Sequence, residues 1–257
     1  KINTIFISHT HADHVTGLPG ILMLSSQVDR DEPLYIIGPP KIKEYVEENR
    51  RVLDMYINYE IIIREIETPG TVYQGEGFHI DAFWLRHTKP CMGYVLIEDE
   101  RPGVFNPQEA ERLQVPKGPK WAKLQNGETV LSETGEEVPS EAVMGPNRPG
   151  RKIGYVTDTV YFDGIAPKVG GCDFLVCEGM FKHELEESAR EKKHLTAHQA
   201  ATVARDAGGV GKLGLIHYSP RYTEYELRQL LNEAREVFPD TVLTRDRLTY
   251  DIPYKEE

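Results

Sequence analysis

The chain has 257 residues, with 30 lysines and arginines against 41 aspartates and glutamates, so its formal net charge at pH 7 is -11. This charge excludes a generally basic protein that coats nucleic acid. Hydrophobic residues make up 39% of the chain, which excludes wholesale disorder and is enough for a packed core. No stretch approaches the roughly 20 apolar residues of a membrane helix, and three irregularly spaced cysteines do not form a disulfide framework. We therefore expect a cytoplasmic protein with no membrane partner.

Strands and helices are expected to alternate along the first hundred residues. The apolar run 2–8 is rich in β-branched residues and predicts a buried strand that ends at a polar cluster. Because the chain opens directly on this strand, we expect it to begin in the middle of a fold. The hydrophobic pattern then predicts helices that begin near residue 17 and span 41–55, and strands over 34–38, 60–66, 78–85 and 93–97.

Composition changes over residues 98–151, which are rich in proline, glycine and charge and contain few consecutive apolar residues. Such a segment is not expected to bury much of itself, so we predict an inserted arm that leaves the globular body. A short helix is expected over 107–113, with hairpin turns at Asn126-Gly127 and Thr134-Gly135. An insertion of this length is usually functional or disordered.

Regular structure resumes after the arm. Strands are predicted over 152–157, 174–177 and 213–216, helices over 197–207 and 224–237, and short strands at the end of the chain. Alternating strands and helices of this kind are typical of α/β layers.

The most distinctive local pattern is His9-x-His11-x-Asp13-His14, four potential metal ligands within six residues at the end of the first predicted strand. Residues two apart on an extended segment point the same way, so His9 and His11 should approach one ion while Asp13 and His14 turn towards a second. This cluster supplies too few ligands for two ions. Further ligands must therefore come from elsewhere in the chain.

Three further candidates follow predicted strands, namely His87, Asp158 and His217. Functional groups of α/β sheets lie at such strand ends, although each residue alone could be a turn or capping residue. A carboxylate such as Asp158 can bridge two cations, and imidazole suits zinc, or manganese and iron less selectively. Two ions about 3.5–4 Å apart would activate a water and hold a phosphodiester for in-line displacement.

Together these segments resemble the ribonuclease Z branch of the metallo-β-lactamase superfamily. The histidine cluster is typical of the whole superfamily, whereas the Lys-Gly-Pro arm and the segment after His217 are typical of this branch. The stretches that carry the resemblance are IFISHTHADHVTGLPG (5–20), RPGVF (101–105), VPKGP (115–119), LQNG (124–127), GRKIGYVTDT (150–159), HLTA (194–197) and IHYSPRY (216–222).

The resemblance implies a single α/β domain over 1–257, the metallo-β-lactamase αββα sandwich, with residues 98–151 as an inserted exosite arm. It also implies that this chain lacks the family's N-terminal β-strands and is a truncated member. The implied activity is that of a zinc-dependent endoribonuclease that removes the 3′ trailer from tRNA precursors and leaves a 3′-hydroxyl. Family members are homodimers, so a homodimer is expected, with two Zn²⁺ per subunit and Mn²⁺ or Fe²⁺ as alternatives.

The family's roles transfer to this chain position by position. Asp158 would bridge the two ions, and Asp13 would also orient or deprotonate the attacking water. The metal ligands implied are His9, His11 and His87 for one ion and Asp13, His14 and His217 for the other. His194 would protonate the leaving 3′-oxygen, and Glu178 would orient His194. Without the resemblance, Glu178 could be a strand-end carboxylate and His194 a residue at a helix start.

This sequence departs from the family next to that acid pair. Where the family often has His-Glu-Ala-Thr, this chain has Cys177-Glu178-Gly179-Met180, so only the glutamate remains and the surroundings of the pair are open to question. Thr157 also stands where a glycine is common, before Asp158.

Binding of RNA by an acidic protein requires locally concentrated positive charge, because phosphate contacts dominate affinity. The arm carries cations with no acid between Arg112 and Gly127, and Trp121 lies among them as a stacking or anchoring group. The alternative is a solvated basic surface. The RNA-binding residues expected are Arg112, Lys117, Gly118, Pro119, Lys120, Trp121 and Lys123 in the arm, and Ser219, Arg221 and Tyr222 after His217. Arg221 could instead pair with a carboxylate of the body.

Two other functions fit parts of the sequence. One is a hydrolase of the same superfamily that acts on a small phosphodiester, sulfate ester or thioester, although such an enzyme has no need for the arm. The other is an inactive RNA-binding remnant, suggested by the missing strands and by the residues around Glu178.

Overall fold

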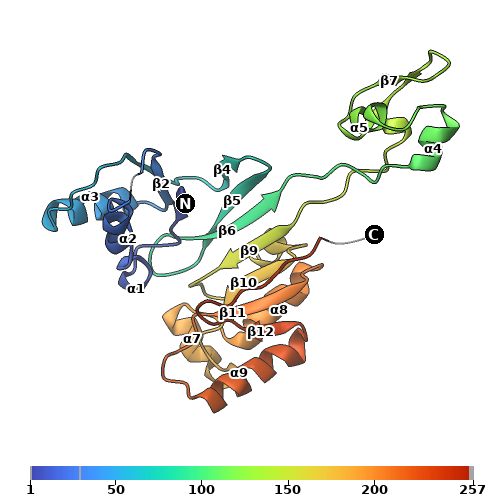
Figure 1. The fold of residues 1–257 in the computed structure, drawn as a ribbon. Helices are drawn as coiled ribbons and strands as arrows, with labels where there is room; N and C mark the ends of the chain where they lie inside the picture. Colours follow the sequence, from blue (N-terminus) through green and yellow to red (C-terminus); the bar gives the residue numbers. More distant parts are fainter. Residues whose placement is uncertain (1, 29, 255–257) are drawn as a thin grey trace. The chain divides into compact units, whose positions relative to one another are not determined.

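The computed structural model describes residues 2–28 and 30–254, which divide into two compact units. We call them the body, which comprises the residues up to 97 together with 151–253, and the arm, which comprises 98–150 together with Tyr254. Each unit is described by itself below, and most of the elements are labelled in Figure 1.

A small parallel sheet opens the body. Its strands run in the order β1 (Thr4–Phe6), β2 (Leu34–Gly38) and β3 (Ile61–Glu65). Helices α2 (Leu18–Ser25) and α3 (Ile42–Val52) pack against it through a core that includes Leu22, Ile36 and Val46. Strands rich in β-branched apolar residues suit such a covered parallel sheet.

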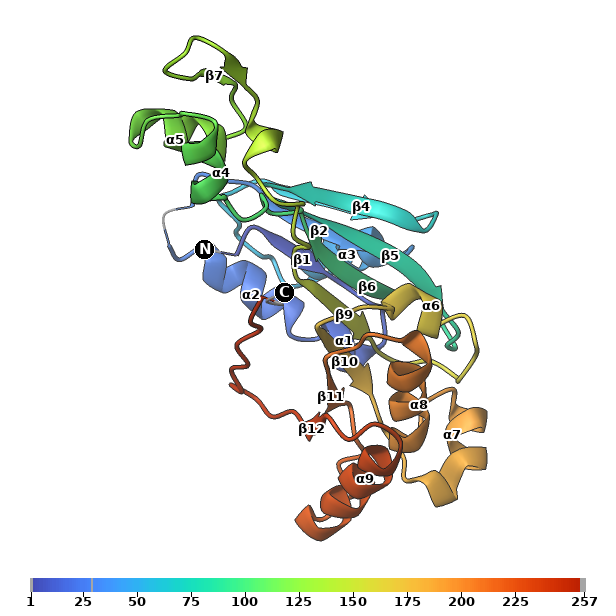
Figure 2. The same cartoon turned by 90° about the vertical axis from the view of Figure 1, so that its right-hand side faces the viewer.

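The large sheet has seven strands in the order β12-β11-β10-β9-β6-β5-β4. Strands β9 to β12 pair in parallel, whereas β6 and β9 are antiparallel, as are β4 and β5. Their bounds are β4 Gly70–Gly75, β5 Phe78–Leu85, β6 Cys91–Glu98, β9 Lys152–Val156, β10 Phe174–Glu178, β11 Lys212–Ile216 and β12 Thr241–Leu243. Helices α8 (Ala197–Ala207) and α9 (Glu224–Val237) pack on one face of this sheet. The short helices α6 (Ala166–Val169) and α7 (Glu186–Lys192) lie nearby (Figure 2).

The two sheets pack against each other through a third apolar cluster. Ile37 of β2 and Phe6 of β1 meet Ile80 and Ala82 of β5 and Met92 of β6. The body is therefore layered helix, sheet, sheet, helix, because α2 and α3 cover the small sheet and α8 and α9 cover the large one.

The arm has its own core. It contains α4 (Pro107–Arg112), α5 (Pro119–Gln125) and the two-stranded sheet of β7 (Val130–Leu131) and β8 (Glu137–Val138). The residues buried in its core are Ala110, Val115, Leu124, Val130, Val138 and Val143. The expectation that the arm buries little of itself is therefore wrong, because these scattered apolar residues converge without a regular period.

Most predicted elements are confirmed within two or three residues, including helices α3, α8 and α9. The hairpin turn is confirmed at Thr134-Gly135 but wrong at Asn126-Gly127, where the chain ends α5. Pro119 at the first turn of α5 is a helix-start signal that the hairpin interpretation overlooked. In the described part of the chain, no helix is both long and apolar enough to cross a membrane.

Candidate metal centre

The ends of several strands bring the predicted ligands together. Strands β9, β10 and β11 are parallel, so their carboxyl ends share one edge of the sheet, where Asp158, Glu178 and His217 lie. His217 has a left-handed backbone, with φ 55°, which is strained for a residue other than glycine. His87 lies between β5 and β6, outside both strands.

The histidine motif is only partly extended. His11 has an extended backbone, with φ -74° and ψ 150°, but α1 (Ala12–Val15), which follows it, is helical, with Asp13 in its first turn. A helical turn therefore directs the side chains of Asp13 and His14.

The first ligand group consists of His9, His11, His87 and Asp158. His11 Nδ1 lies 3.0 Å from His9 Nε2 and 3.1 Å from His87 Nε2. Asp158 Oδ2 lies 3.6 Å from both Nε2 atoms. Nitrogen and oxygen ligands of a tetrahedral ion lie roughly 3.3–3.6 Å apart. The two Asp158 distances match this spacing and the two nitrogen–nitrogen distances are slightly shorter, so the group suits one small cation after a small outward shift of the rings.

The second ligand group consists of Asp13, His14 and His217. Asp13 Oδ2 is 3.4 Å from His14 Nε2 and 3.7 Å from His217 Nε2. His14 Nε2 is also 3.4 Å from Asp158 Oδ2, the oxygen that faces the first group. Asp158 Oδ2 thus faces histidines of both groups.

Two observations show that these residues fit a divalent cation. His9 Nε2 and His87 Nε2 both approach His11 Nδ1, and a single N–H cannot satisfy three converging nitrogen atoms. His14 Nε2 is buried and has no hydrogen-bond partner. Buried polar atoms are normally satisfied, so orphaned and converging lone pairs of this kind are expected where a cation binds.

The electrostatics of the site support the same conclusion. Burial, together with nearby His14, lowers the pKa of His9 to about 3, so the ring is neutral and can act as a ligand at pH 7. Burial acts to raise the pKa of Asp158, but His14 and His217 hold it well below its usual range. Burial acts to lower the pKa of His217, but Glu178 and Asp158 raise it to about 9. Metal binding through His217 must therefore displace a proton.

Glu178 and the partly buried His194 form a pair beside the ligand groups. Glu178 is fully buried, and its Oε2 lies 2.9 Å from His194 Nδ1. Its Oε1 accepts hydrogen bonds from the backbone N–H groups of Thr159, at 2.7 Å, and Leu195, at 3.2 Å. Backbone groups hold the Glu178 carboxylate in place. The side chains next to Glu178, where this sequence differs from the family pattern, are therefore not needed to position it. A side chain at Gly179 would press against Leu215 and Ala197.

Several contacting residues were not predicted from the sequence. The Ser8 hydroxyl lies 3.2 Å and the Cys91 thiol 3.6 Å from His9 Nδ1, and the Thr157 hydroxyl donates to Asp158 Oδ1 at 2.9 Å. The Lys193 carbonyl lies 3.0 Å from His87 Nδ1. Ser8 and Thr157 adjoin predicted ligands, which is a usable signal, whereas the Lys193 contact involves backbone and leaves no sequence signal.

Within the arm, the expected cations lie on α4 and α5 but are paired with acids or backbone. Arg112 forms a two-point contact with Glu109, and Lys117 Nζ lies 2.8 Å from Glu111. Lys123 lies 3.9 Å from Glu128, and Lys120 donates to the Leu131 carbonyl. The arm is therefore less positive than the run of cations indicates.

Trp121 stabilises the arm. Its Nε1 donates to the Val115 carbonyl at 2.9 Å, and its ring packs against Phe105 with centroids 5.1 Å apart. Gly118, with φ 116°, and Pro119 open α5. The tryptophan therefore serves as an anchoring group within the arm.

The residues after His217 lie in the body. Tyr222 packs on the main core, and its hydroxyl accepts a hydrogen bond from the Lys182 N–H at 3.0 Å. Ser219 donates its backbone N–H to the Met180 carbonyl at 3.2 Å. Arg221 is exposed, and its backbone N–H contacts Ser219 Oγ at 3.4 Å. Of these three residues, Arg221 is the most exposed, so its guanidinium is best placed to meet a ligand from solvent.

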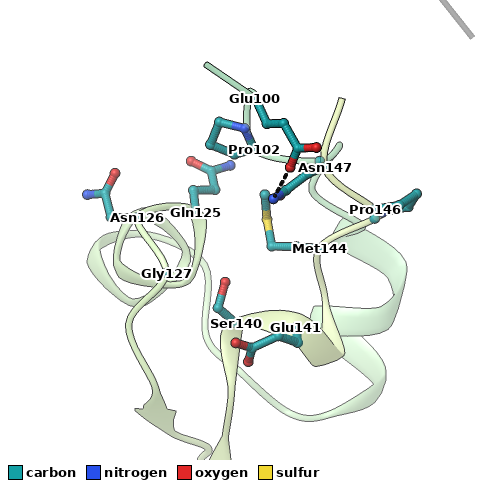
Figure 3. Close-up of a pocket in the computed structure, with 12 residues that line it drawn as sticks. Glu100, Pro102, Gln125, Asn126, Gly127, Ser140, Glu141, Met144, Pro146 and Asn147 are labelled. Carbon is teal, nitrogen blue, oxygen red and sulfur yellow. Dashed lines mark hydrogen bonds between the residues drawn. The ribbon is translucent and has the colours of Figure 1, made fainter. Parts of the chain in front are cut away.

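The arm also contains a cavity of about 840 Å³, shown in Figure 3. Gln125 and Asn126 line one side, and Glu100 accepts a hydrogen bond from Asn147 at 3.2 Å on the other. Among the described residues, no lysine or arginine lines it. The cavity therefore does not suit a phosphate, and the cations of the arm lie outside it.

Comparison with known proteins first defines the class. A model of the beta-lactamase superfamily domain matches residues 1–107 and 131–218, well over half of the chain. A short-form human tRNase Z has a TM-score of 0.66 at 22% identity, covering 98% of this chain and 80% of that one. A metallo-beta-lactamase fold protein of Bacillus subtilis has a TM-score of 0.60 at 18% identity, covering 95% and 74%. The predicted metallo-β-lactamase fold is confirmed.

The particular family follows from closer relatives. Ribonuclease Z of Treponema denticola is 61% identical over 256 residues, which is 100% of this chain and 83% of the relative. Ribonuclease Z of Treponema pallidum is 60% identical over 256 residues, covering 100% and 82%. Ribonuclease Z of Borrelia duttonii is 43% identical over 246 residues, covering 93% and 76%. The chain belongs to the ribonuclease Z family of the beta-lactamase superfamily.

Proposed function

We propose that the protein is a metal-dependent endoribonuclease that removes the 3′ trailer from tRNA precursors. The observation that carries this proposal is the pair of ligand groups that both face Asp158 and lie beside the Glu178–His194 pair. Relatives named Ribonuclease Z at 60–61% identity support the choice of substrate.

The metal assignment is two divalent ions per subunit, taken to be Zn²⁺, with Mn²⁺ or Fe²⁺ as alternatives. His9, His11 and His87 would hold one ion, and Asp13, His14 and His217 the other, with Asp158 in common. Bound ions would supply an activated water and stabilise negative charge on the phosphate. Asp13 lies within 3.4 Å of His14 and is exposed on its other side, so it is placed to orient the attacking water.

The acid for the second half of the reaction is His194. As water attacks phosphorus, the bond from phosphorus to the 3′-oxygen of the tRNA breaks, and that oxygen takes a proton from His194. Glu178 fixes the ring through Nδ1, at 2.9 Å, which leaves Nε2 to face the substrate. The products are a tRNA with a 3′-hydroxyl and a trailer with a 5′-phosphate.

The proposal includes a cytoplasmic homodimer in which the arm acts as an RNA exosite. The exposed apolar side chains of α2 support self-association, since Ile21 is 44% and Leu24 64% exposed. A helix that is apolar on all sides is normally covered. Sedimentation of the full-length protein tests the dimer.

Cleavage-site mapping on a precursor tRNA tests the function. The full-length protein with Zn²⁺ or Mn²⁺ should cut 3′ of the discriminator nucleotide and leave a 3′-hydroxyl. A product that ends in a 3′-phosphate, or hydrolysis of small esters without RNA cleavage, would overturn the proposal. Metal analysis should give about two ions per chain.

A further inference from the structure

Lys193 lies where α7 ends, directly before His194. Its backbone is left-handed, with φ 57° and ψ 53°, and its N–H bonds to the Arg190 carbonyl at 3.2 Å. This conformation costs a residue with a side chain roughly 1 kcal/mol, and glycine adopts it freely. A strained backbone next to a functional site indicates that the conformation serves a purpose there.

Lys193 contacts His87 in both directions. The Lys193 carbonyl lies 3.0 Å from His87 Nδ1, and Lys193 Nζ donates to the His87 carbonyl at 3.3 Å. A carbonyl can only accept, so His87 Nδ1 must carry the hydrogen. In the neutral ring, Nε2 then keeps its lone pair, and this atom faces His11 Nδ1 at 3.1 Å and Asp158 Oδ2 at 3.6 Å.

The same backbone turn also sets the acid pair. Immediately after Lys193, the His194 N–H bonds to the Ala189 carbonyl at 2.8 Å, while the His194 ring reaches Glu178 at 2.9 Å. The next N–H, of Leu195, bonds to the other oxygen of Glu178 at 3.2 Å. The left-handed residue Lys193 therefore contacts His87, and the two residues that follow it contact Glu178.

We propose that Lys193 is a positioning residue: its left-handed backbone fixes the tautomer of His87 and the placement of His194 at the same time. The role of His194 in this statement rests on the proposed function, whereas the role of His87 does not. The lysine ammonium is dispensable, because the carbonyl makes the contact that selects the tautomer. Disturbing this backbone weakens both metal binding and acid catalysis by His194. Removing the His194 ring affects acid catalysis alone.

Substitutions that differ in left-handed preference test the proposal. Glycine accepts the left-handed backbone without cost, alanine accepts it about as well as the native lysine, and β-branched valine accepts it least, while all three remove the ammonium. In the metal-free protein, nitrogen NMR of the imidazoles should show His87 with hydrogen on Nδ1 in wild type, Lys193→Gly and Lys193→Ala, and a fraction of the other tautomer in Lys193→Val.

Zinc affinity, measured by competition with a chelator, should fall in the same order. We expect about 10–100-fold weaker binding for Lys193→Val and less than about threefold for Lys193→Gly, the range found when a partner of a metal ligand is lost. If Lys193→Val does not fold, as judged by circular dichroism, Lys193→Thr, which is also β-branched, takes its place. A loss in Lys193→Ala as large as in the β-branched variant would show that the ammonium matters and would overturn the proposal, as would wild-type tautomer and affinity in the β-branched variant. Neither readout uses RNA, so failure of the proposed function would be seen separately.

Discussion

The metal centre of the body and the basic surface of the arm both depend on charged side chains, but these side chains differ in burial. The side chains of Asp158 and Glu178 are 3% and 0% exposed, whereas those of Arg112 and Lys117 are 68% and 72% exposed. Buried charges require partners, so their arrangement reports what the site binds. Exposed pairs contribute little, typically under about 1 kcal/mol, so the sequence run alone is weak evidence for a binding surface.

The largest effect is expected from Asp158, which faces both ligand groups. Asp158→Asn keeps the shape but removes the charge that faces four histidine nitrogens within 3.6 Å. We expect turnover of precursor tRNA to fall at least about 10³-fold and bound metal to drop below two ions per chain. His11→Ala should do the same. Single-turnover kinetics and metal analysis measure both.

The matched control is Asp163→Asn, which removes one exposed carboxylate that belongs to none of the ligand groups. It should retain wild-type rate and metal content. Wild-type metal content in Asp158→Asn would contradict its assignment as the shared ligand.

Removing the arm tests whether the two regions act independently. Its buried core, which includes Ala110, Leu124 and Val138, is separate from the apolar clusters of the body. Replacing residues 102–149 by a short glycine–serine linker should lower cleavage of precursor tRNA on the order of 100-fold or more, because remote binding energy is lost. Hydrolysis of a small phosphodiester should stay within about threefold. Equal loss of both activities would contradict an exosite.

His194 separates acid catalysis from metal binding. His194→Ala should slow cleavage about 100-fold, the usual contribution of a general acid, while two ions stay bound. His183→Ala, at an exposed histidine paired with Glu186, serves as the control and should leave the rate unchanged. His194 Nδ1 is 3.9 Å from Asp158 Oδ2, so loss of an ion from His194→Ala would instead identify His194 as a ligand.

The sequence predicted the metal centre better than its surroundings, for a physical reason. Asp158 and His217 were identifiable because parallel strands end at a common edge of the sheet, and His87 was identifiable because it follows a predicted strand. The helical turn at Asp13 could not be identified from the sequence, since four residues are too few to show a hydrophobic period. The pairing of Glu178 with His194 depended on the family resemblance. Lys193 contacts His87 through its backbone carbonyl, which every residue type possesses, so the sequence could not predict this contact.

The pH dependence of the metal-free protein tests the electrostatics of the centre. The pKa of His217 is raised to about 9 in the folded protein, above its ordinary 6.5. Its contribution to stability is therefore complete below pH 6.5 and is lost as the pH rises through about 9. The difference in free energy of unfolding between wild type and His217→Asn should shrink between pH 6 and 10, by at most about 3 kcal/mol. Urea unfolding with a chelator present measures it, and a constant difference would contradict the raised pKa.

The smallest effect concerns the paired cations of the arm. Glu111→Gln should free Lys117, whose Nζ lies 2.8 Å from Glu111 while both side chains remain more than half exposed. An additional free cation should strengthen RNA binding about two- to threefold at low salt, and the gain should vanish at high salt. Glu136→Gln, in the β7–β8 turn, removes the same charge without releasing Lys117. If filter binding shows equal gains for the two variants, net charge rather than the released lysine accounts for the effect, and Lys117 is not a phosphate contact.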